Sequence, residues 1–381
     1  MNVHPRLNDI DISGIRKMAE RIARTPGALS LAIGQPDFPT PGHIIEAAKR
    51  ALDTGKTGYT PNAGVPELRE AACRFVNRKY GLDYRPEETI VTVGAAEAID
   101  LTFRTLLRDG DEVVLPAPVY PGYEPVVRLC GAVPVFVDTR STGFKLTAEH
   151  LERHLTPRTR CVVLPYPSNP TGQTMDRREL ENIANLLRDI NLFVVSDEIY
   201  SELVFYKEHV SMASLPGMRD KTVVVNGLSK SHAMTGFRIG FVFAPEGLIR
   251  QMLKMHQYAV TCAPTVSQYA AIEALTNGFD DAAPMREEYA RRAAYACRRL
   301  RAFGFDVVEP EATFYLFPSI LPFGLPSETF AVRLLEEEKV GIVPGNAFSP
   351  IGEGYVRLSC ACPPEQLEQA LDRIGKFVSR L

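Results

Sequence analysis

Lys230 is the residue of this sequence whose type and position most directly suggest chemistry. It lies in the segment Gly227–His232 (GLSKSH), directly after the apolar run Thr222–Asn226. Ligands of open parallel sheets bind beyond the carboxyl ends of the strands, so an amine at this place is expected at a ligand-binding edge. Arg238 follows eight residues later. A lone lysine here is better explained as an exposed loop residue, so its neighbours decide its meaning.

Polar side chains also follow the ends of other apolar runs. Asp197 comes directly after the run Leu192–Ser196, and Tyr200 lies three residues further on. Asn169 stands in Ser168–Gly172 (SNPTG), past the run at 161–164. The other members are Tyr120 after the run at 112–115, and Ala95 and Ala96 at a helix start after 89–93. Five strand ends thus bring an amine, a carboxylate, an amide, two phenols and an anion-binding helix start to one edge.

This set of groups matches the needs of pyridoxal phosphate. A lysine forms a Schiff base with the aldehyde of this cofactor, and a carboxylate keeps its pyridine nitrogen protonated. An amide and a phenol can hydrogen-bond the ring hydroxyl, while a second aromatic ring can stack on the cofactor ring. Backbone N–H groups at a helix start and an arginine hold a phosphate dianion. The residues therefore indicate an enzyme that uses pyridoxal phosphate.

The elements that must position these residues alternate between strands and helices. We predict strands at 89–93, 112–115, 133–137, 161–164, 192–196, 222–226 and 239–244, with helices at 96–107, 120–130 and 176–188 between them. Several strands are apolar throughout, as strands covered on both faces are. The predicted fold class is therefore α/β, with a large domain whose mainly parallel seven-stranded sheet lies between helices.

The pattern changes beyond residue 244, and the last stretch of the chain predicts a smaller α+β domain. Helices are expected at 245–256, 265–277, 285–303, 327–339 and 364–381, and strands at 306–309, 313–317 and 355–359. The segment up to Gly42 contains no convincing sheet strand. We expect an arm at 1–42 that packs on the small domain or on a partner subunit, a large domain at 43–284 and a small domain at 285–381.

Composition excludes several other classes of protein. The 43 basic and 46 acidic side chains among 381 residues give a net charge of −3, which argues against a nucleic-acid-binding surface. No segment resembles a signal peptide or a membrane span. Seven cysteines at irregular spacings favour reduced thiols in the cytoplasm. His150 and His154 fit a solvated helix face better than a zinc site, and no metal is expected.

In their order along the chain, these residues resemble the class I and II aminotransferases, which are fold-type I pyridoxal-phosphate enzymes. The resemblance covers essentially the whole chain. It rests on Gly34–Phe38 (GQPDF), Tyr59–Gly64 (YTPNAG), Ser168–Gly172 (SNPTG), Ser196–Tyr200 (SDEIY), Ser229–Gly240 (SKSHAMTGFRIG) and Tyr355–Ser359 (YVRLS). It implies that an amino group moves between an L-amino acid and a 2-oxo acid or aldehyde by a ping-pong mechanism.

The resemblance also implies a role for each matching residue. Lys230 matches the lysine that binds the cofactor aldehyde, and Asp197 matches the partner of the pyridine nitrogen. Asn169 and Tyr200 match the donors to the ring oxygen. The remaining matches are Tyr120 at the stacking position, Ala95, Ala96 and Arg238 in the phosphate cradle with Ser229 as a further phosphate donor, and Gly34, Asn169 and Arg357 at the substrate. The peptide bond Asn169–Pro170 is expected to be cis.

Partners and substrates are further implications of the resemblance. Tyr59 matches a tyrosine that reaches the phosphate in the neighbouring subunit, which implies a homodimer with shared active sites. Closer resemblance in Asp11–Lys17 (DISGIRK), Pro121–Pro125 (PGYEP) and Val163–Ser168 (VLPYPS) points to a bacterial group assigned to N-acetyl-L,L-diaminopimelate transamination in lysine biosynthesis. The second substrate-binding arginine of the aspartate branch has no counterpart. Glutamate is the expected amino donor.

Other interpretations of the same residues stay open. Singly, Asp197 is equally a helix N-cap, Asn169 a turn residue and Arg357 a surface ion-pair residue. The same cofactor residues also serve aromatic or broad-specificity aminotransferases and C–S β-lyases. A cofactor-sensing regulator would need an added DNA-binding domain, for which the segment before Gly34 is too short. A nucleotide-binding protein is disfavoured because the phosphate-loop match ending at 55–57 has Arg50 in place of its first glycine.

Overall fold

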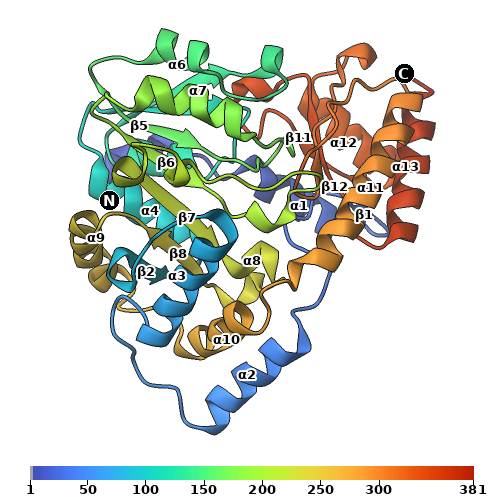
Figure 1. Cartoon of the computed structure of the whole chain (residues 1–381). Coiled ribbons are helices and arrows are strands. Elements are labelled where there is room, and N and C mark those ends of the chain that lie inside the picture. Colours follow the sequence, from blue (N-terminus) through green and yellow to red (C-terminus); the bar gives the residue numbers. More distant parts are fainter. Residues whose placement is uncertain (1–2) are drawn as a thin grey trace.

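The computed structural model describes residues 3–381, which form a large α/β part and a smaller α+β part beside it (Figure 1). Within these residues, one sheet contains seven strands in the order β2-β8-β7-β6-β5-β3-β4. They are β2 (Thr89–Thr92), β3 (Glu112–Ala117), β4 (Val133–Asp138), β5 (Thr159–Leu164), β6 (Phe193–Asp197), β7 (Thr222–Gly227) and β8 (Gly240–Phe243). Only β8 runs antiparallel to its neighbours. The predicted α/β class and mainly parallel sheet are confirmed.

Helices cover both faces of this sheet, which explains why its inner strands are apolar throughout. Val223 and Val225 of β7 pack in the layer of α4, α5 and α9, whereas Val224 packs in the layer of α3 and α10. The helices of this part are α2 (Gly42–Asp53), α3 (Pro66–Tyr80), α4 (Gly94–Leu106), α5 (Tyr123–Leu129), α6 (Ala148–His154), α7 (Arg177–Leu187), α8 (Leu228–Ser231), α9 (Glu246–Ala259) and α10 (Thr265–Thr276). Because both faces of the inner strands are buried, the register between neighbouring strands is fixed, and the ends of the strands keep fixed positions relative to one another.

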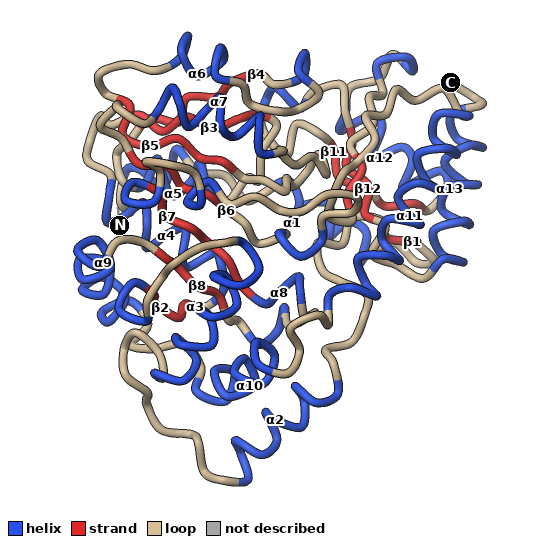
Figure 2. The backbone as a smooth tube through the Cα atoms, in the orientation of Figure 1, coloured by secondary structure: helices blue, strands red, loops and turns tan. Residues whose placement is uncertain are grey.

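The smaller part consists of short strands and long helices. Figure 2 shows α11 and α13 side by side at the edge of the molecule farthest from the large sheet. The elements are α1 (Gly14–Ala23), β1 (Leu29–Ser30), α11 (Ala282–Ala302), β9 (Tyr315–Leu316), α12 (Ser327–Glu338), β10 (Val340–Gly341), β11 (Val343–Pro344), β12 (Val356–Ser359) and α13 (Pro364–Val378). No helix of residues 3–381 is both long and apolar enough to cross a membrane.

Three sequence-based expectations about these elements were wrong. The arm does contain a strand, because β1 pairs in parallel with β10, but two residues are too short for a detectable alternation. The strand expected at 306–309 is reduced to a single bridge between Asp306 and Ser319. The helix expected from residue 120 begins only at Tyr123, after a turn at Pro121 and Gly122.

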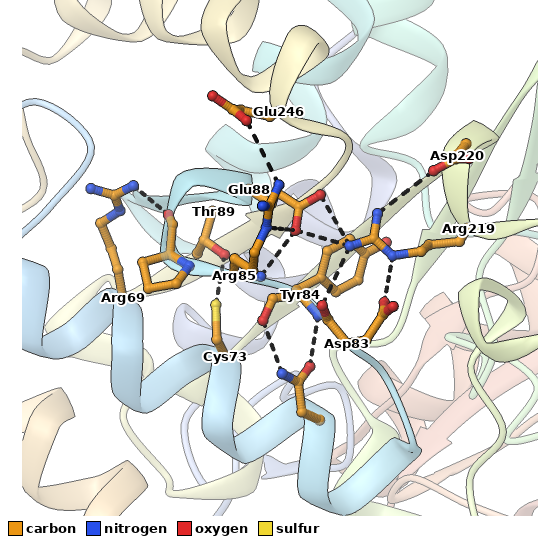
Figure 3. A network of polar contacts seen from close by, with 12 residues as sticks. Arg69, Cys73, Asp83, Tyr84, Arg85, Glu88, Thr89, Arg219, Asp220 and Glu246 are labelled. Carbon is orange, nitrogen blue, oxygen red and sulfur yellow. Dashed lines mark hydrogen bonds and ion pairs between the residues drawn. The ribbon is translucent and has the colours of Figure 1, made fainter.

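A network of charged side chains joins the amino ends of β2 and β7 (Figure 3). The Arg219 Nη2 atom donates to both carboxylate oxygens of the buried Glu88, at 2.9 and 3.0 Å. The same guanidinium pairs with Asp83 and lies 4.7 Å from the ring centre of Tyr84. Burial opposes ionisation of Glu88, but hydrogen bonds from Arg219 and Arg85 outweigh burial and lower the pKa of this carboxyl group. The network fixes the start of the strand that leads to the site.

Candidate active site

Asp197 is the last residue of β6 and is buried at the carboxyl end of the sheet. The Tyr123 hydroxyl donates to Asp197 Oδ2 over 2.6 Å, and the N–H of Ile199 donates to Oδ1 over 3.2 Å. Burial raises the pKa of Asp197 to about 6, although the Tyr123 hydrogen bond acts in the opposite direction. Within residues 3–381 no basic side chain forms an ion pair with Asp197, so a cation on a ligand would complete this carboxylate.

Tyr123 is a site residue that sequence analysis missed. It lies in the segment Pro121–Pro125, and its side chain is almost fully buried on α5. The rings of Tyr120 and Tyr123 meet edge to face with centres 5.5 Å apart. Tyr120 lies before the helix begins, so helical spacing does not place the two rings together, and their contact follows from the turn at Pro121 and Gly122.

Lys230 lies on α8, the short helix that follows β7. Its Nζ atom donates to the carbonyl oxygen of Gly34 and lies 5.8 Å from the ring centre of Tyr200. Burial, with the nearby cations Arg357 and Arg238, lowers the pKa of this amine to about 8. At pH 7 about a tenth of this amine is therefore neutral, and the neutral amine is the form that acts as nucleophile and base.

Ser231 and His232, which follow Lys230, hold α8 in place. His232 is buried, and its Nε2 atom lies 2.9 Å from the carbonyl oxygen of Gly278, which can only accept a hydrogen bond. Nε2 therefore carries the proton, and Nδ1 accepts from the Ser231 hydroxyl at 2.7 Å. Through this chain of contacts the turn before α11 holds the segment that carries Lys230.

Gly94, Arg238 and Gly240 form a tightly packed corner at the start of α4. Gly94 has φ +74°, and a Cβ on it would lie 2.5 Å from Arg238 Nη2. A Cβ on Gly240 would lie 2.6 Å from the backbone nitrogen of Ala95. The first N–H groups of a helix lack intrahelical partners, and Ala95 and Ala96 lie in this first turn. The corner thus combines free N–H groups, the positive end of a helix and a guanidinium, which together suit a phosphate.

Arg357 lies on β12 and is only 1% exposed. Its Nη1 atom donates to Asn169 Oδ1 over 2.9 Å, and Nη2 donates to the carbonyl oxygen of Ala32 over 2.8 Å. Its Nε atom has no hydrogen-bond partner, and no carboxylate pairs with the guanidinium, within residues 3–381. Burial lowers the pKa of Arg357 below its usual range. A buried arginine with an unused donor is suited to a carboxylate ligand.

Tyr315 joins the two parts of the molecule at this site and was also missed. Its hydroxyl lies 3.1 Å from the hydroxyl of Tyr200, and its ring centre lies 4.3 Å from the Arg357 guanidinium. A Cβ on Gly34 would come within 3.2 Å of the same hydroxyl, so a glycine keeps this space open. Sequence analysis predicted only a strand at 313–317, because nothing in a strand pattern shows which ring faces a site.

The remaining predicted residues differ in their surroundings. Tyr120 is half-buried beside Tyr123, and Ser229 is buried on α8 next to Lys230. Tyr59 is 89% exposed in the loop between α2 and α3, and within the described chain it makes no hydrogen bond to another predicted site residue. The Asn169–Pro170 peptide bond is cis, as the resemblance implies.

Comparison with known proteins defines the class to which this fold and site belong. Residues 26–374 match the family of class I and II aminotransferases, and the chain belongs to this family. It is therefore a transaminating enzyme with the fold-type I architecture.

Particular relatives narrow the comparison. The chain is 55% identical over 377 residues to a probable N-acetyl-LL-diaminopimelate aminotransferase of Bacillus subtilis, covering 99% of this chain and 95% of that one. The aspartate aminotransferase of Thermus thermophilus solved with maleate is 37% identical, with a TM-score of 0.94 and coverage of 99% of both chains. The aromatic aminotransferase of Pyrococcus horikoshii is 40% identical, with a TM-score of 0.91 over 95% of this chain and 99% of that one.

Proposed function

We propose that this aminotransferase binds pyridoxal phosphate at the carboxyl edge of its large sheet. The observation that carries the proposal is the placement of two groups at the ends of the adjacent strands β6 and β7: Lys230, whose pKa is lowered to about 8, and Asp197, whose pKa is raised to about 6. When bound, the cofactor supplies an aldehyde that binds the substrate amino group and a ring that accepts the electrons freed when the α-proton leaves.

The donors of this edge fit the parts of that cofactor one by one. The buried carboxylate of Asp197 would hold the protonated pyridine nitrogen, with Tyr123 keeping its oxygen in place. The corner of Gly94 and Arg238 has the free N–H groups and cation that a phosphate needs. Asn169 and Tyr200 would donate to the ring oxygen. Tyr120 would stack on the ring, and Ala95, Ala96 and Ser229 would line the phosphate.

The chain's own residues carry the proton and orient the substrate. Arg357 would bind the α-carboxylate through its unused Nε and one Nη. This grip aligns the Cα–H bond for transfer. Gly34, whose carbonyl oxygen accepts from Lys230 Nζ, would lie at the same substrate. The Lys230 Nζ atom would take the α-proton and return a proton later in the same half-reaction, for which a pKa of about 8 is suitable. The second half-reaction reverses these events with another oxo acid.

We further propose a homodimer with shared active sites, as the resemblance to the family implies. The supporting feature is Tyr59, an aromatic side chain that is 89% exposed on the single chain and would reach the phosphate of the partner. Light scattering should give twice the mass of one chain at micromolar concentration, and a monomeric mass would contradict the dimer. The chain would divide into an arm at 1–42, a large domain at 43–284 and a small domain at 285–381, and it would work in the cytoplasm with its seven cysteines reduced.

The proposed reaction exchanges an amino group between N-acetyl-L,L-diaminopimelate and 2-oxoglutarate, within lysine biosynthesis. The products are the oxo acid that corresponds to N-acetyl-L,L-diaminopimelate, and glutamate. In the biosynthetic direction glutamate is the amino donor. The Bacillus subtilis relative supports this substrate. A cavity of about 390 Å³ supports it as well, because Tyr120 and Phe348 lie in its wall together with arm residues such as Ile12 and Lys17. That volume leaves room for a side chain longer than that of aspartate.

Parallel steady-state assays test the substrate. N-acetyl-L,L-diaminopimelate, aspartate, phenylalanine and cystathionine would each be offered as amino donor with 2-oxoglutarate as acceptor, and glutamate, pyruvate and ammonia would be quantified. We expect the first donor to give the highest kcat/KM, by about tenfold or more, with ping-pong kinetics. A higher kcat/KM for phenylalanine would contradict the proposed substrate and indicate an aromatic amino acid instead. Formation of pyruvate and ammonia from cystathionine, without glutamate, would indicate that the enzyme catalyses elimination and not transamination.

A further inference from the structure

Charged side chains hydrogen-bond both backbone polar groups of Val93, its N–H and its carbonyl oxygen. Its N–H donates to Glu97 Oε2, and its carbonyl oxygen accepts from Arg238 Nη2 at 3.4 Å. The Thr92 hydroxyl donates to the carbonyl oxygen of Gly94 over 3.0 Å. Three side chains thus fix the turn in which β2 passes into α4, and this turn sets the direction of the first N–H groups of the helix.

Glu97 is in turn held by a histidine from another helix. His256 lies on α9, its side chain is 0% exposed, and its Nδ1 atom lies 2.7 Å from Glu97 Oε1. Its Nε2 atom is buried without a hydrogen-bond partner in the described chain. A carboxylate can only accept a hydrogen bond, so Nδ1 of His256 carries a proton and donates it to Glu97. Both oxygens of Glu97 are therefore occupied, one by the Val93 backbone and one by His256.

Glu97 has the wrong charge for direct contact with a phosphate, so its contribution must be geometric. We propose that Glu97 and His256 are positioning residues that orient the Val93–Gly94 turn and thereby set the affinity of the corner for the cofactor phosphate. This inference rests on the proposed function, because it needs a phosphate-bearing ligand at the start of α4. Glu97 could otherwise be an ordinary acidic residue in a first helical turn, which would affect stability alone.

Binding of two cofactor forms separates the two roles. The dissociation constants of pyridoxal phosphate and of pyridoxal, which lacks the phosphate, would be measured by absorbance titration of the cofactor-free dimer. Both ligands carry the aldehyde for Lys230, so the ratio of the two constants isolates the phosphate. In Glu97→Ala we expect pyridoxal phosphate to bind about tenfold more weakly while pyridoxal stays within about twofold.

Further variants keep the test decisive. Glu97→Gln retains an acceptor for the Val93 N–H, and its ratio should stay within about threefold of wild type. His256→Leu removes the donor that holds Glu97, and its ratio of the pyridoxal phosphate dissociation constant to the pyridoxal dissociation constant should rise by about threefold or more. Asp100→Asn removes a carboxylate one turn along the same helix, which pairs with Arg104, and should leave the ratio unchanged.

Each outcome has a defined meaning. Equal weakening of both ligands in Glu97→Ala and His256→Leu would reduce the pair to a structural role and overturn the inference. An unchanged ratio in both variants would do the same. A wild-type chain that binds pyridoxal phosphate no better than pyridoxal would instead overturn the proposed phosphate corner, and with it the proposed function.

Discussion

The large sheet has charged groups at both ends of its strands, and their pKa values are shifted in opposite ways at the two ends. At the amino end, Glu88 and Arg219 satisfy one another, and the pKa of Glu88 is lowered while that of Arg219 is raised. At the carboxyl end, the pKa of Asp197 is raised to about 6 and that of Lys230 is lowered to about 8. The shifts of Glu88 and Arg219 at the amino end favour their charged forms. The shifts of Asp197 and Lys230 at the carboxyl end favour their neutral forms.

This difference in pKa shifts distinguishes a cluster that stabilises the fold from one that is suited to bind a ligand. A network that satisfies its own charges contributes to the folded state and leaves nothing for a ligand. Groups that are buried with unused donors or without close counter-charges weaken the fold, and such groups cluster where a ligand completes them. Arg357, with its unpartnered Nε, belongs to the second kind. The comparison predicts that substitutions at one end cost stability and substitutions at the other cost activity.

The largest effect is expected from Lys230→Ala. Turnover should fall by about 10⁴-fold or more, because no other amine of the site replaces the proton carrier. Stability of the cofactor-free chain should not fall, since the variant removes a desolvated ammonium. Steady-state assay and urea unfolding of the same preparation measure both quantities. Turnover of Lys230→Ala near the wild-type rate would contradict the proposed catalytic role of Lys230 at the carboxyl end of the sheet.

Arg219→Ala should show the converse behaviour. It leaves Glu88 buried without its main partner, so the free energy of unfolding should fall by about 3 kcal/mol. The kcat of the folded enzyme should stay within about twofold of wild type. Arg104→Ala, which breaks an exposed pair with Asp100, is the matched control and should change stability by less than about 0.5 kcal/mol. A loss of activity without a loss of stability in Arg219→Ala would contradict the assignment of this end.

The pH dependence of stability should have opposite signs at the two ends. The folded pKa of Asp197 is raised, so its contribution to the stability of the cofactor-free chain is present below about pH 4 and is lost as pH rises through about 6. The folded pKa of Glu88 is lowered, so its contribution is present above its ordinary pKa and is lost as pH falls through the folded value.

Urea unfolding over this pH range checks both signs. The stability of wild type minus that of Asp197→Asn should decrease by roughly 3 kcal/mol from about pH 4 to pH 7. The corresponding difference for Glu88→Gln should increase as pH rises from the acid limb. Slopes of the same sign for the two variants would show that the two ends do not differ in the way described.

Tyr315→Phe should have the smallest effect. It removes the hydroxyl contact with Tyr200 but keeps the ring against Arg357. We expect kcat to fall by roughly three- to tenfold with little change in KM for the amino acid, and stability to change by less than about 1 kcal/mol. Tyr355→Phe, whose ring packs on Phe317, is the control. A rise in KM with unchanged kcat would mean that Tyr315 acts on substrate binding instead.

Much of the site could be predicted from sequence because parallel strands bring their carboxyl ends to one edge. Asp197 and Lys230 each follow an apolar run, so their neighbourhood in space follows from topology alone. Tyr123, Tyr315 and the pair of Glu97 and His256 could not be predicted in this way. Their roles depend on which side chain faces which across elements far apart in the chain, and such contacts leave no periodic signal. The two-residue strand β1 escaped for the related reason that a strand so short shows no alternation.

The central claim is that the carboxyl end of this sheet binds pyridoxal phosphate through Lys230 and uses it to accept an amino group. The visible absorbance of the purified protein, recorded with pyridoxal phosphate, then with L-glutamate and then with 2-oxoglutarate, tests this claim most directly. We predict a visible band that disappears with glutamate and returns with the oxo acid in the wild type, and that fails to cycle in Lys230→Ala. A wild-type protein that gains no visible band when pyridoxal phosphate is added would contradict the account.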